Sequence, residues 1–93
     1  MYATIRNYDG GSEWADALVE HEDDIRNVIS AIDGFRAYYL IRTQEGPTTI
    51  SVFDDEAGAE ASTEAAADYV THNLLDMSPA SPRVRSGEVA LSF

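Results

Sequence analysis

A chain of 93 residues has room for one domain with one hydrophobic core, and we expect residues 1–93 to form it. The chain has 17 Asp and Glu residues against 6 basic residues, all of them arginines, so its formal net charge is −11. Phosphate groups are neutralised by basic clusters, so this balance argues against nucleic acid and anionic membranes as partners, and the lack of cysteine excludes disulfides and thiol catalysis.

The first predicted element is a strand over residues 2–8, whose side chains alternate between two faces. One face carries Ala3, Ile5 and Asn7, and the other carries Tyr2, Thr4, Arg6 and Tyr8. The Asp-Gly-Gly run at 9–11 ends this strand. A single helix is predicted next, because Ser12 is a suitable N-cap, apolar residues from Trp14 to Ile32 follow helical spacing, and Gly34 can end a helix in a left-handed conformation.

Two further strands are predicted at 35–43 and 48–53, joined by the Gln-Glu-Gly-Pro turn at 44–47 into an antiparallel hairpin. Both faces of the first of these strands are apolar. Phe35, Tyr39 and Ile41 lie on one face, and Tyr38 and Leu40 lie on the other. Because two helices can cover only one side of a four-stranded sheet, we expect a second subunit to cover the other side.

The second helical region begins at Asp54 or Asp55, either of which can cap it. Gly58 and the Ser-Thr pair at 62–63 weaken its first part, so we expect a short turn there and a firmer helix over 63–76. The residues expected to face inward are Ala66, Tyr69, Val70, Asn73, Leu74 and Met77. A Pro-rich loop at 78–82 ends this helix, and a last strand is predicted over 83–93.

The predicted order is β-α-β-β-α-β, an α+β ferredoxin-like domain with a four-stranded antiparallel sheet and two helices on one face. The Gly34-Phe35 pair, the hairpin and the Val-Phe-Asp-Asp-Glu-Ala segment at 52–57 leading into an alanine-rich helix resemble the dimeric α/β-barrel superfamily, within it the antibiotic-biosynthesis-monooxygenase-like domains. The resemblance covers nearly the whole chain. It implies a homodimer whose two sheets face each other as a barrel, with a ligand cavity between sheet and helices in each subunit.

The same resemblance implies several activities. Members of this family include cofactor-independent oxygenases of polycyclic aromatic compounds, haem-degrading enzymes and proteins without an assigned activity. Haem degraders use an asparagine on the first strand, a tryptophan on the second helix and a histidine further along it. Here Asn7 matches the first position, but Tyr69 stands at the position most like the tryptophan, and His72 follows it too soon. We therefore expect no cofactor and disfavour haem as the substrate.

Two polar residues are candidates for catalysis. His21 lies on the apolar stripe of the first predicted helix, where an imidazole could orient a substrate hydroxyl or move a proton. The alternative is a histidine hydrogen-bonded at a helix edge without a catalytic role. Asn7 could bind a ligand through its amide, or it could simply end its strand. The two histidines are isolated from each other, and they predict no metal site.

Aromatic residues could line the cavity around a flat apolar ligand, and the alternative is that they only fill the core. The candidates for ligand binding are Trp14, Tyr39, Phe53, Tyr69 and His72, with Tyr38 beside them. Arginines on or beside strands could bind an anionic ligand, but we favour ion pairing with Glu88 or with acidic residues of a partner. These are Arg6, Arg36, Arg42, Arg83 and Arg85.

The sequence also allows predictions about the cell compartment and the source organism. No run of about 18 apolar residues occurs, and segment 1–6 is too short and polar for a signal peptide, so we expect a cytoplasmic protein. An acidic, lysine-free surface suits a cytoplasm of high ionic strength and indicates a halophilic source. A GC-rich genome that favours arginine codons would explain the same composition.

Two functions are consistent with these features. The first is a homodimer that binds a small apolar or aromatic ligand, with cofactor-independent monooxygenase activity. The second is a non-enzymatic dimeric interaction module whose pocket is filled by its own side chains. The volume of the pocket separates the two, because a cavity of several hundred cubic ångströms is needed for such a ligand.

Overall fold

The computed structural model describes residues 1–9, 11–73 and 82–93 and shows four strands and three helices in these ranges. In chain order they are β1 (Tyr2–Asn7), α1 (Gly11–Glu20), α2 (Glu22–Ser30), β2 (Phe35–Thr43), β3 (Gly46–Phe53), α3 (Glu56–Asn73) and β4 (Arg83–Glu88). None of the described helices is long and apolar enough to cross a membrane.

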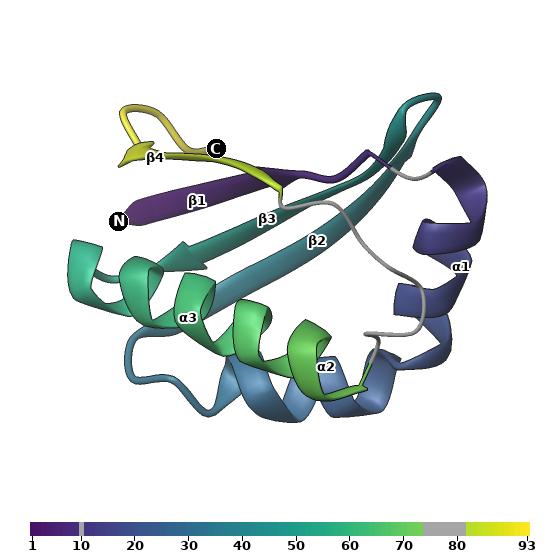
Figure 1. Ribbon diagram of the computed structural model, residues 1–93. Helices are drawn as coiled ribbons and strands as arrows, with labels where there is room; N and C mark the ends of the chain where they lie inside the picture. The colour runs from purple at the N-terminus through teal and green to yellow at the C-terminus, as the bar shows by residue number, and fades with distance from the viewer. Residues whose placement is uncertain (10, 74–81) are drawn as a thin grey trace.

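The strands form one sheet in the order β2-β3-β1-β4, and all three neighbouring pairs are antiparallel. The helices lie together on one side of this sheet, and the other side carries no described helix (Figure 1). This arrangement confirms the predicted ferredoxin-like fold. We call the covered side the inner face and the bare side the outer face.

The first helical segment differs from the prediction, because it is two helices rather than one. The chain turns at His21, whose backbone angles are φ −96° and ψ 22°, and the N–H of His21 bonds to the carbonyls of Ala17 and Leu18. Three acidic residues, 22–24, then occupy the first turn of α2, where the helix dipole favours negative charge. The second helix ends at Ser30, and Gly34 (φ +83°) lies in the turn that follows.

The helix α3 also differs from the prediction, because it is continuous from Glu56 and has no turn in its first part. The Asp55 carboxylate accepts a hydrogen bond from the N–H of Gly58 (3.0 Å) and so caps the helix, as expected. Its first turns bury Gly58, Ala59 and Ser62, whose small side chains allow close approach to the sheet. Asn73 is exposed rather than inward, and the predictions for Leu74 and Met77 and for the loop at 78–81 lie outside the described residues.

Several strand boundaries are corrected too. The hairpin turn is tighter than expected, because β3 begins at Gly46, which adopts φ 143° and pairs with Thr43. The last strand stops at Glu88, and beyond it the N–H of Val89 bonds to the carbonyl of Met1 (2.9 Å). The Ser12 side chain, predicted to cap α1, lies outside the described side chains.

A bulge in β2 between Phe35 and Ala37 changes the face of one aromatic residue. Phe35 pairs with Phe53 and stacks edge to face on it, with ring centroids 5.9 Å apart. It therefore lies on the inner face with Tyr38, whereas simple alternation had placed it with Tyr39 on the outer face.

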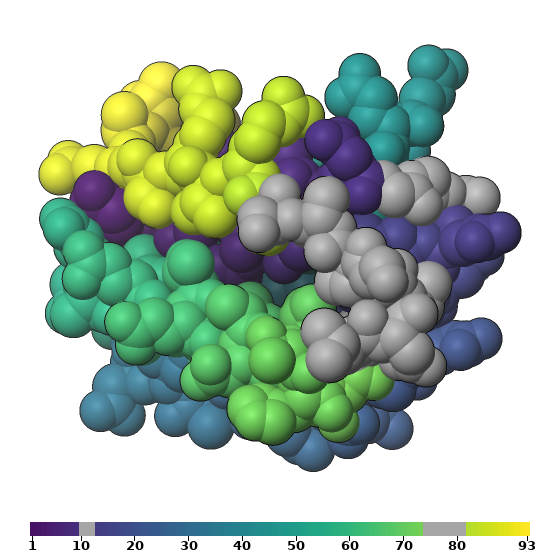
Figure 2. All heavy atoms as spheres, in the orientation of Figure 1, coloured from purple at the N-terminus to yellow at the C-terminus, as the bar shows by residue number. Residues whose placement is uncertain are grey.

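The core lies between the inner face and the helices in two clusters. One is formed by Tyr8, Trp14 and Leu18, and the other by Ile29, Phe53 and Ala59. In the space-filling view β1 is visible only between α3 and its neighbouring strand β4 (Figure 2). The inner face of β1 is nevertheless polar, since Thr4 and Arg6 are buried there.

The outer face is apolar at its centre. Ile5 of β1 pairs with Ile50 of β3, which pairs in turn with Tyr39 of β2, so these three side chains form a row across the sheet. The exposed fractions are 36% for Ile5, 57% for Tyr39 and 44% for the neighbouring Ile41. A sheet face of this kind is typical of a surface that another protein layer covers.

Candidate functional site

An apolar groove of about 580 Å³ lies between the helices α1 and α2 and the strand β2. Most of its lining is apolar or aromatic and comes from Leu18, Val19, Ile25, Ile29, Phe35, Tyr38 and Leu40. Glu22, Arg26 and Ser30 of α2 complete it. A groove of this volume matches the size of sites that bind small organic molecules.

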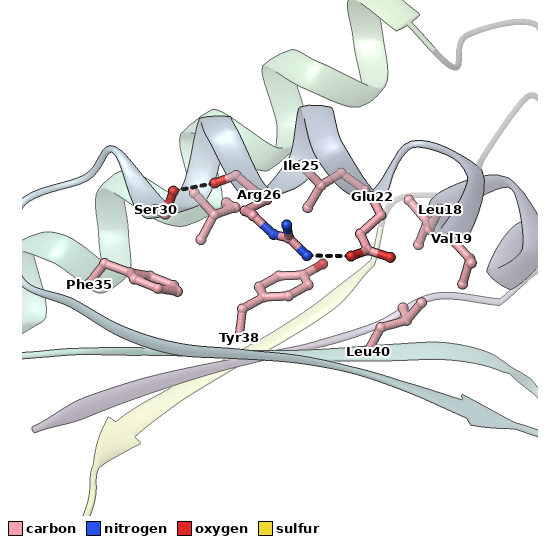
Figure 3. Close-up of a pocket in the computed structure, with 10 residues that line it drawn as sticks. Leu18, Val19, Glu22, Ile25, Arg26, Ser30, Phe35, Tyr38 and Leu40 are labelled. Carbon is pink, nitrogen blue, oxygen red and sulfur yellow. Dashed lines mark hydrogen bonds and ion pairs between the residues drawn. The ribbon is translucent and has the colours of Figure 1, made fainter.

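The groove has an aromatic floor and a polar edge (Figure 3). The rings of Phe35 and Tyr38 rise from β2 toward α2, and Ile25 points down from α2 toward them. Glu22 and Arg26 form an ion pair one helical turn apart, and both side chains are mostly exposed. A ligand would therefore contact apolar carbon on the sheet side and charged groups at the helix side.

Tyr38 is the one hydroxyl-bearing aromatic residue in this lining. Burial raises the pKa of Tyr38 to about 12, although the positive charge of Arg6 opposes the shift. The phenol therefore stays protonated at neutral pH and can donate a hydrogen bond, but it does not supply a phenolate base.

Tyr38 also borders a second, smaller cavity of about 30 Å³, which lies next to Arg6 and Thr49. The two cavities share Leu18, Ile25, Ile29 and Tyr38 in their linings. Tyr69 and Val70 of α3 close the smaller cavity on the helix side.

His21 lies at the junction of α1 and α2 and does not line the groove. Its Nδ1 is 2.8 Å from the Tyr69 hydroxyl, and that hydroxyl also lies 3.2 Å from Asp24 Oδ2. Burial and the Asp24 carboxylate raise the pKa of Tyr69, which keeps the hydroxyl protonated. These contacts tie the junction of the first two helices to α3.

Asn7 lies on the outer face, opposite to the groove. Its Oδ1 accepts a hydrogen bond from the Thr48 hydroxyl (2.8 Å) on the neighbouring strand. The two candidates for catalysis, His21 and Asn7, are thus on different sides of the sheet, and the structure does not bring them together.

The five candidates for ligand binding are likewise dispersed. Trp14 and Phe53 are buried in the two core clusters, and Tyr69 borders the small cavity. Tyr39 is exposed on the outer face. His72 is exposed on α3, and its Nδ1 lies 2.7 Å from the Asp68 carbonyl. None of the five lines the groove.

Of the aromatic residues predicted to line a cavity, Tyr38 does line the groove, but its other lining residues were not predicted as ligand contacts. The helical spacing of Leu18, Ile25 and Ile29 was a signal for a shared face, but it could not show a gap between that face and β2. Within ranges 1–9, 11–73 and 82–93, no three His, Asp or Glu residues are arranged to hold a metal ion.

Several arginines form ion pairs, but their described partners lie in the same chain and do not include the predicted Glu88. Arg36 pairs with Asp54, Arg42 with Asp16 (2.6 Å) and Arg83 with Asp9 (3.8 Å), all at exposed positions. Arg6 differs, because it is only 2% exposed and its described partners are all hydroxyl groups. Pairing was the wrong prediction for this residue within the described part of the chain.

The fold is shared with several solved structures at low sequence identity. The haem degrader MhuD from Mycobacterium tuberculosis, with two haems in its active site, matches with a TM-score of 0.73 at 13% identity, over 100% of this chain and 99% of that one. A candidate antibiotic biosynthesis monooxygenase from Deinococcus radiodurans gives 0.68 at 14% identity, over 100% and 96%. A dimeric ferredoxin-like protein from an uncultured marine organism gives 0.69 at 12% identity, over 99% and 95%.

No protein-family model and no curated protein matches the sequence. The structural matches confirm the predicted resemblance at the level of the fold, which is that of the antibiotic-biosynthesis-monooxygenase-like proteins.

Proposed function

We propose that this chain, which has the fold of the antibiotic-biosynthesis-monooxygenase-like proteins, is a homodimer that binds a small apolar or aromatic ligand in the groove between α2 and β2. The observation that carries the proposal is the groove itself. It has a volume of about 580 Å³, and its walls are mostly aliphatic and aromatic side chains.

The lining favours a flat molecule. Phe35 and Tyr38 offer two aromatic rings from one strand, and Leu40 continues the apolar surface along it (Figure 3). Aromatic rings gain energy from offset or edge-on contact with another ring, in addition to the burial of apolar area. The neutral Tyr38 phenol can donate a hydrogen bond to an oxygen of the ligand.

The proposed reaction class is cofactor-independent monooxygenation. In such a reaction a ligand methylene becomes a carbonyl: one atom of O₂ enters the product, the other leaves as water with the two hydrogens, and the ligand supplies all four electrons. The chain's own contribution would be to bind and orient the ligand and to exclude water. Its support is the fold shared with the candidate monooxygenase and the haem degrader.

A matched pair of tryptophan substitutions on α2 tests the groove. Ser30 lines it, whereas Asn27 is an exposed neutral residue of the same helix outside the lining. We expect Ser30→Trp to fill the space beside Phe35 and to weaken the binding of 1-naphthol, a neutral aromatic probe, at least about tenfold, a loss of about 1.4 kcal/mol. Fluorescence titration measures the affinity.

The Asn27→Trp variant should bind 1-naphthol like the wild type. Equal affinities for the two tryptophan variants would contradict ligand binding in the groove. Circular dichroism and unfolding of both variants check that they remain folded.

The alternative, a dimeric interaction module that binds no ligand, has one observation in its favour. Trp14 and Phe53 are core residues, so part of the aromatic set predicted for a ligand is filled by the protein itself. Under this alternative 1-naphthol binds neither the wild type nor the two variants saturably.

A further inference from the structure

Arg6 is the most deeply buried charged group in the described part of the chain. It lies on the inner face of β1, directly opposite Thr49 of β3. One guanidinium nitrogen donates to Ser51 Oγ (2.8 Å), and the other donates to Thr63 Oγ1 (3.2 Å) and Ser62 Oγ (3.3 Å). Neutral hydroxyls from β3 and α3 therefore hold the guanidinium in place.

No carboxylate within the described ranges lies at ion-pair distance from this guanidinium. A buried charge without a counter-ion is costly, because hydroxyl groups replace only part of the lost hydration. The chain as a whole carries a net charge of −11, so this cation is isolated inside an acidic protein. Such a charge suggests a function beyond stability.

Among the described residues, two polar atoms beside the small cavity have no hydrogen-bond partner of normal geometry, although the Tyr38 hydroxyl lies close to Thr49. The two atoms are Arg6 Nε and Thr49 Oγ1, both fully buried, and the cavity of about 30 Å³ is lined by these two residues together with Tyr8 and Tyr38. A space of this size accommodates a group as small as one water molecule or one small ion. Both atoms can donate a hydrogen bond, so their preferred partner is an acceptor.

We propose that Arg6 and Thr49 form an internal site for one monovalent anionic group. The guanidinium supplies the charge and the Nε–H donor, and the Thr49 hydroxyl supplies a second donor. A water molecule could accept the same hydrogen bonds, but it would leave the charge uncompensated, whereas an anion satisfies both requirements.

The group could come from two sources. It can be a free ion such as chloride, or it can be the carboxylate of a ligand whose apolar part lies in the groove, since the two cavities share Tyr38 and three aliphatic residues. The second source rests on the proposed function, and the first does not.

Anion exchange at constant ionic strength tests the site. Sodium gluconate, whose anion is too large for the cavity, is replaced stepwise by chloride, which removes the effect of general screening on the acidic surface. At a tenfold excess over the dissociation constant, we expect the melting temperature to rise by about 6–11 °C. The ¹⁵N NMR signal of the Arg6 Nε–H should shift with the same saturation curve.

Three variants test whether the response to chloride depends on Arg6 and Thr49. Arg6→Met should abolish the response to chloride, and Thr49→Val, which keeps the shape but removes the hydroxyl, should weaken the affinity about tenfold. Arg36→Met removes an exposed arginine and should respond like the wild type. If Arg6→Met does not fold, the wild-type NMR titration and Thr49→Val still decide the question.

Titrations with sodium benzoate, sodium formate and 1-naphthol distinguish a free ion from the carboxylate of a ligand as the natural group. If a ligand carboxylate is the natural group, benzoate binds at least about tenfold more tightly than formate, and Ser30→Trp removes this advantage while the response to chloride remains. If a free ion is the natural group, benzoate has no advantage over formate. If 1-naphthol does not bind but the anions do, the result contradicts the proposed function and leaves the anion site intact.

Identical melting temperatures in gluconate, chloride, formate and benzoate, with an unshifted Nε–H signal, would overturn the anion site.

Discussion

Replacing Ile5 with aspartate should convert the proposed homodimer into monomers. Ile5 lies at the centre of the outer face, in one row with Ile50 and Tyr39, and no described helix covers it. If a second copy packs on this face, each dimer would bury two unpaired carboxylates. Because an unpaired buried charge costs several kcal/mol, we expect the dissociation constant to rise at least about a hundredfold.

Light scattering at a series of protein concentrations measures this change as a fall of the molecular mass from that of a dimer to that of a monomer. Val19→Asp is the matched control, because Val19 has a similar exposure but lies on α1, on the opposite side of the sheet. The control should remain a dimer. A wild type that sediments as a monomer, or a dimer that Ile5→Asp leaves intact, would show that the outer face is not the interface.

Phe53→Ala should be the most destabilising single substitution in the core. The Phe53 side chain is completely buried between Phe35, Ile29 and α3, and its removal leaves a cavity where the helix meets the sheet. Substitutions of this kind cost about 3–5 kcal/mol, a large part of the stability of a small domain. Urea unfolding measures the loss, and a loss below about 1 kcal/mol would contradict the packing described here.

Gly58 provides a linked test of the same contact. A Cβ atom at this position would lie 2.9 Å from the Cβ and the ring of Phe53, so Gly58→Ala forces α3 away from the sheet. We expect this substitution to destabilise the wild type by about 1–3 kcal/mol but to cost less in the Phe53→Ala background, where the space is open. Additive losses in the double variant would show that the two residues do not share this contact.

The sequence predicted the topology well, because its strongest signals are local. The alternation over residues 2–8, the hairpin and the capping Asp55 each depend on neighbouring residues, and the structure confirms all three. The weaker predictions depended on tertiary packing. The continuous α3 retains Gly58 and Ser62 because small side chains are needed against Phe53 and Arg6.

The errors at His21 and Phe35 have a common physical cause. Periodicity assumes a regular helix or strand, and it cannot detect one residue at which the regular pattern is broken. At His21 the chain changes direction so that α1 can pack on one core cluster and Ile29 of α2 on the other. The run of acidic residues at 22–24 was the available signal, since it suits the first turn of a new helix.

The candidate site was much less predictable than the fold. The predicted site residues were chosen because they are polar or aromatic. A groove, however, forms where the side chains of α2 and β2 do not meet, and no single residue type predicts such a gap. The burial of Arg6 could have been predicted, because this residue shares a strand face with Thr4 and Tyr8, and the helices cover that face. Its lack of a described counter-ion could be seen only in three dimensions.

An NMR titration of uniformly ¹⁵N-labelled wild-type protein with 1-naphthol tests ligand binding in the groove most directly. Binding in the groove should produce saturable shifts for the backbone amides of the lining residues on both sides, above all Ile25 and Ile29 of α2 and Phe35 and Leu40 of β2. The amides of the edge strand β4 should change little. Shifts centred on the outer face, or no saturable shift at any concentration of the probe, would contradict binding in the groove.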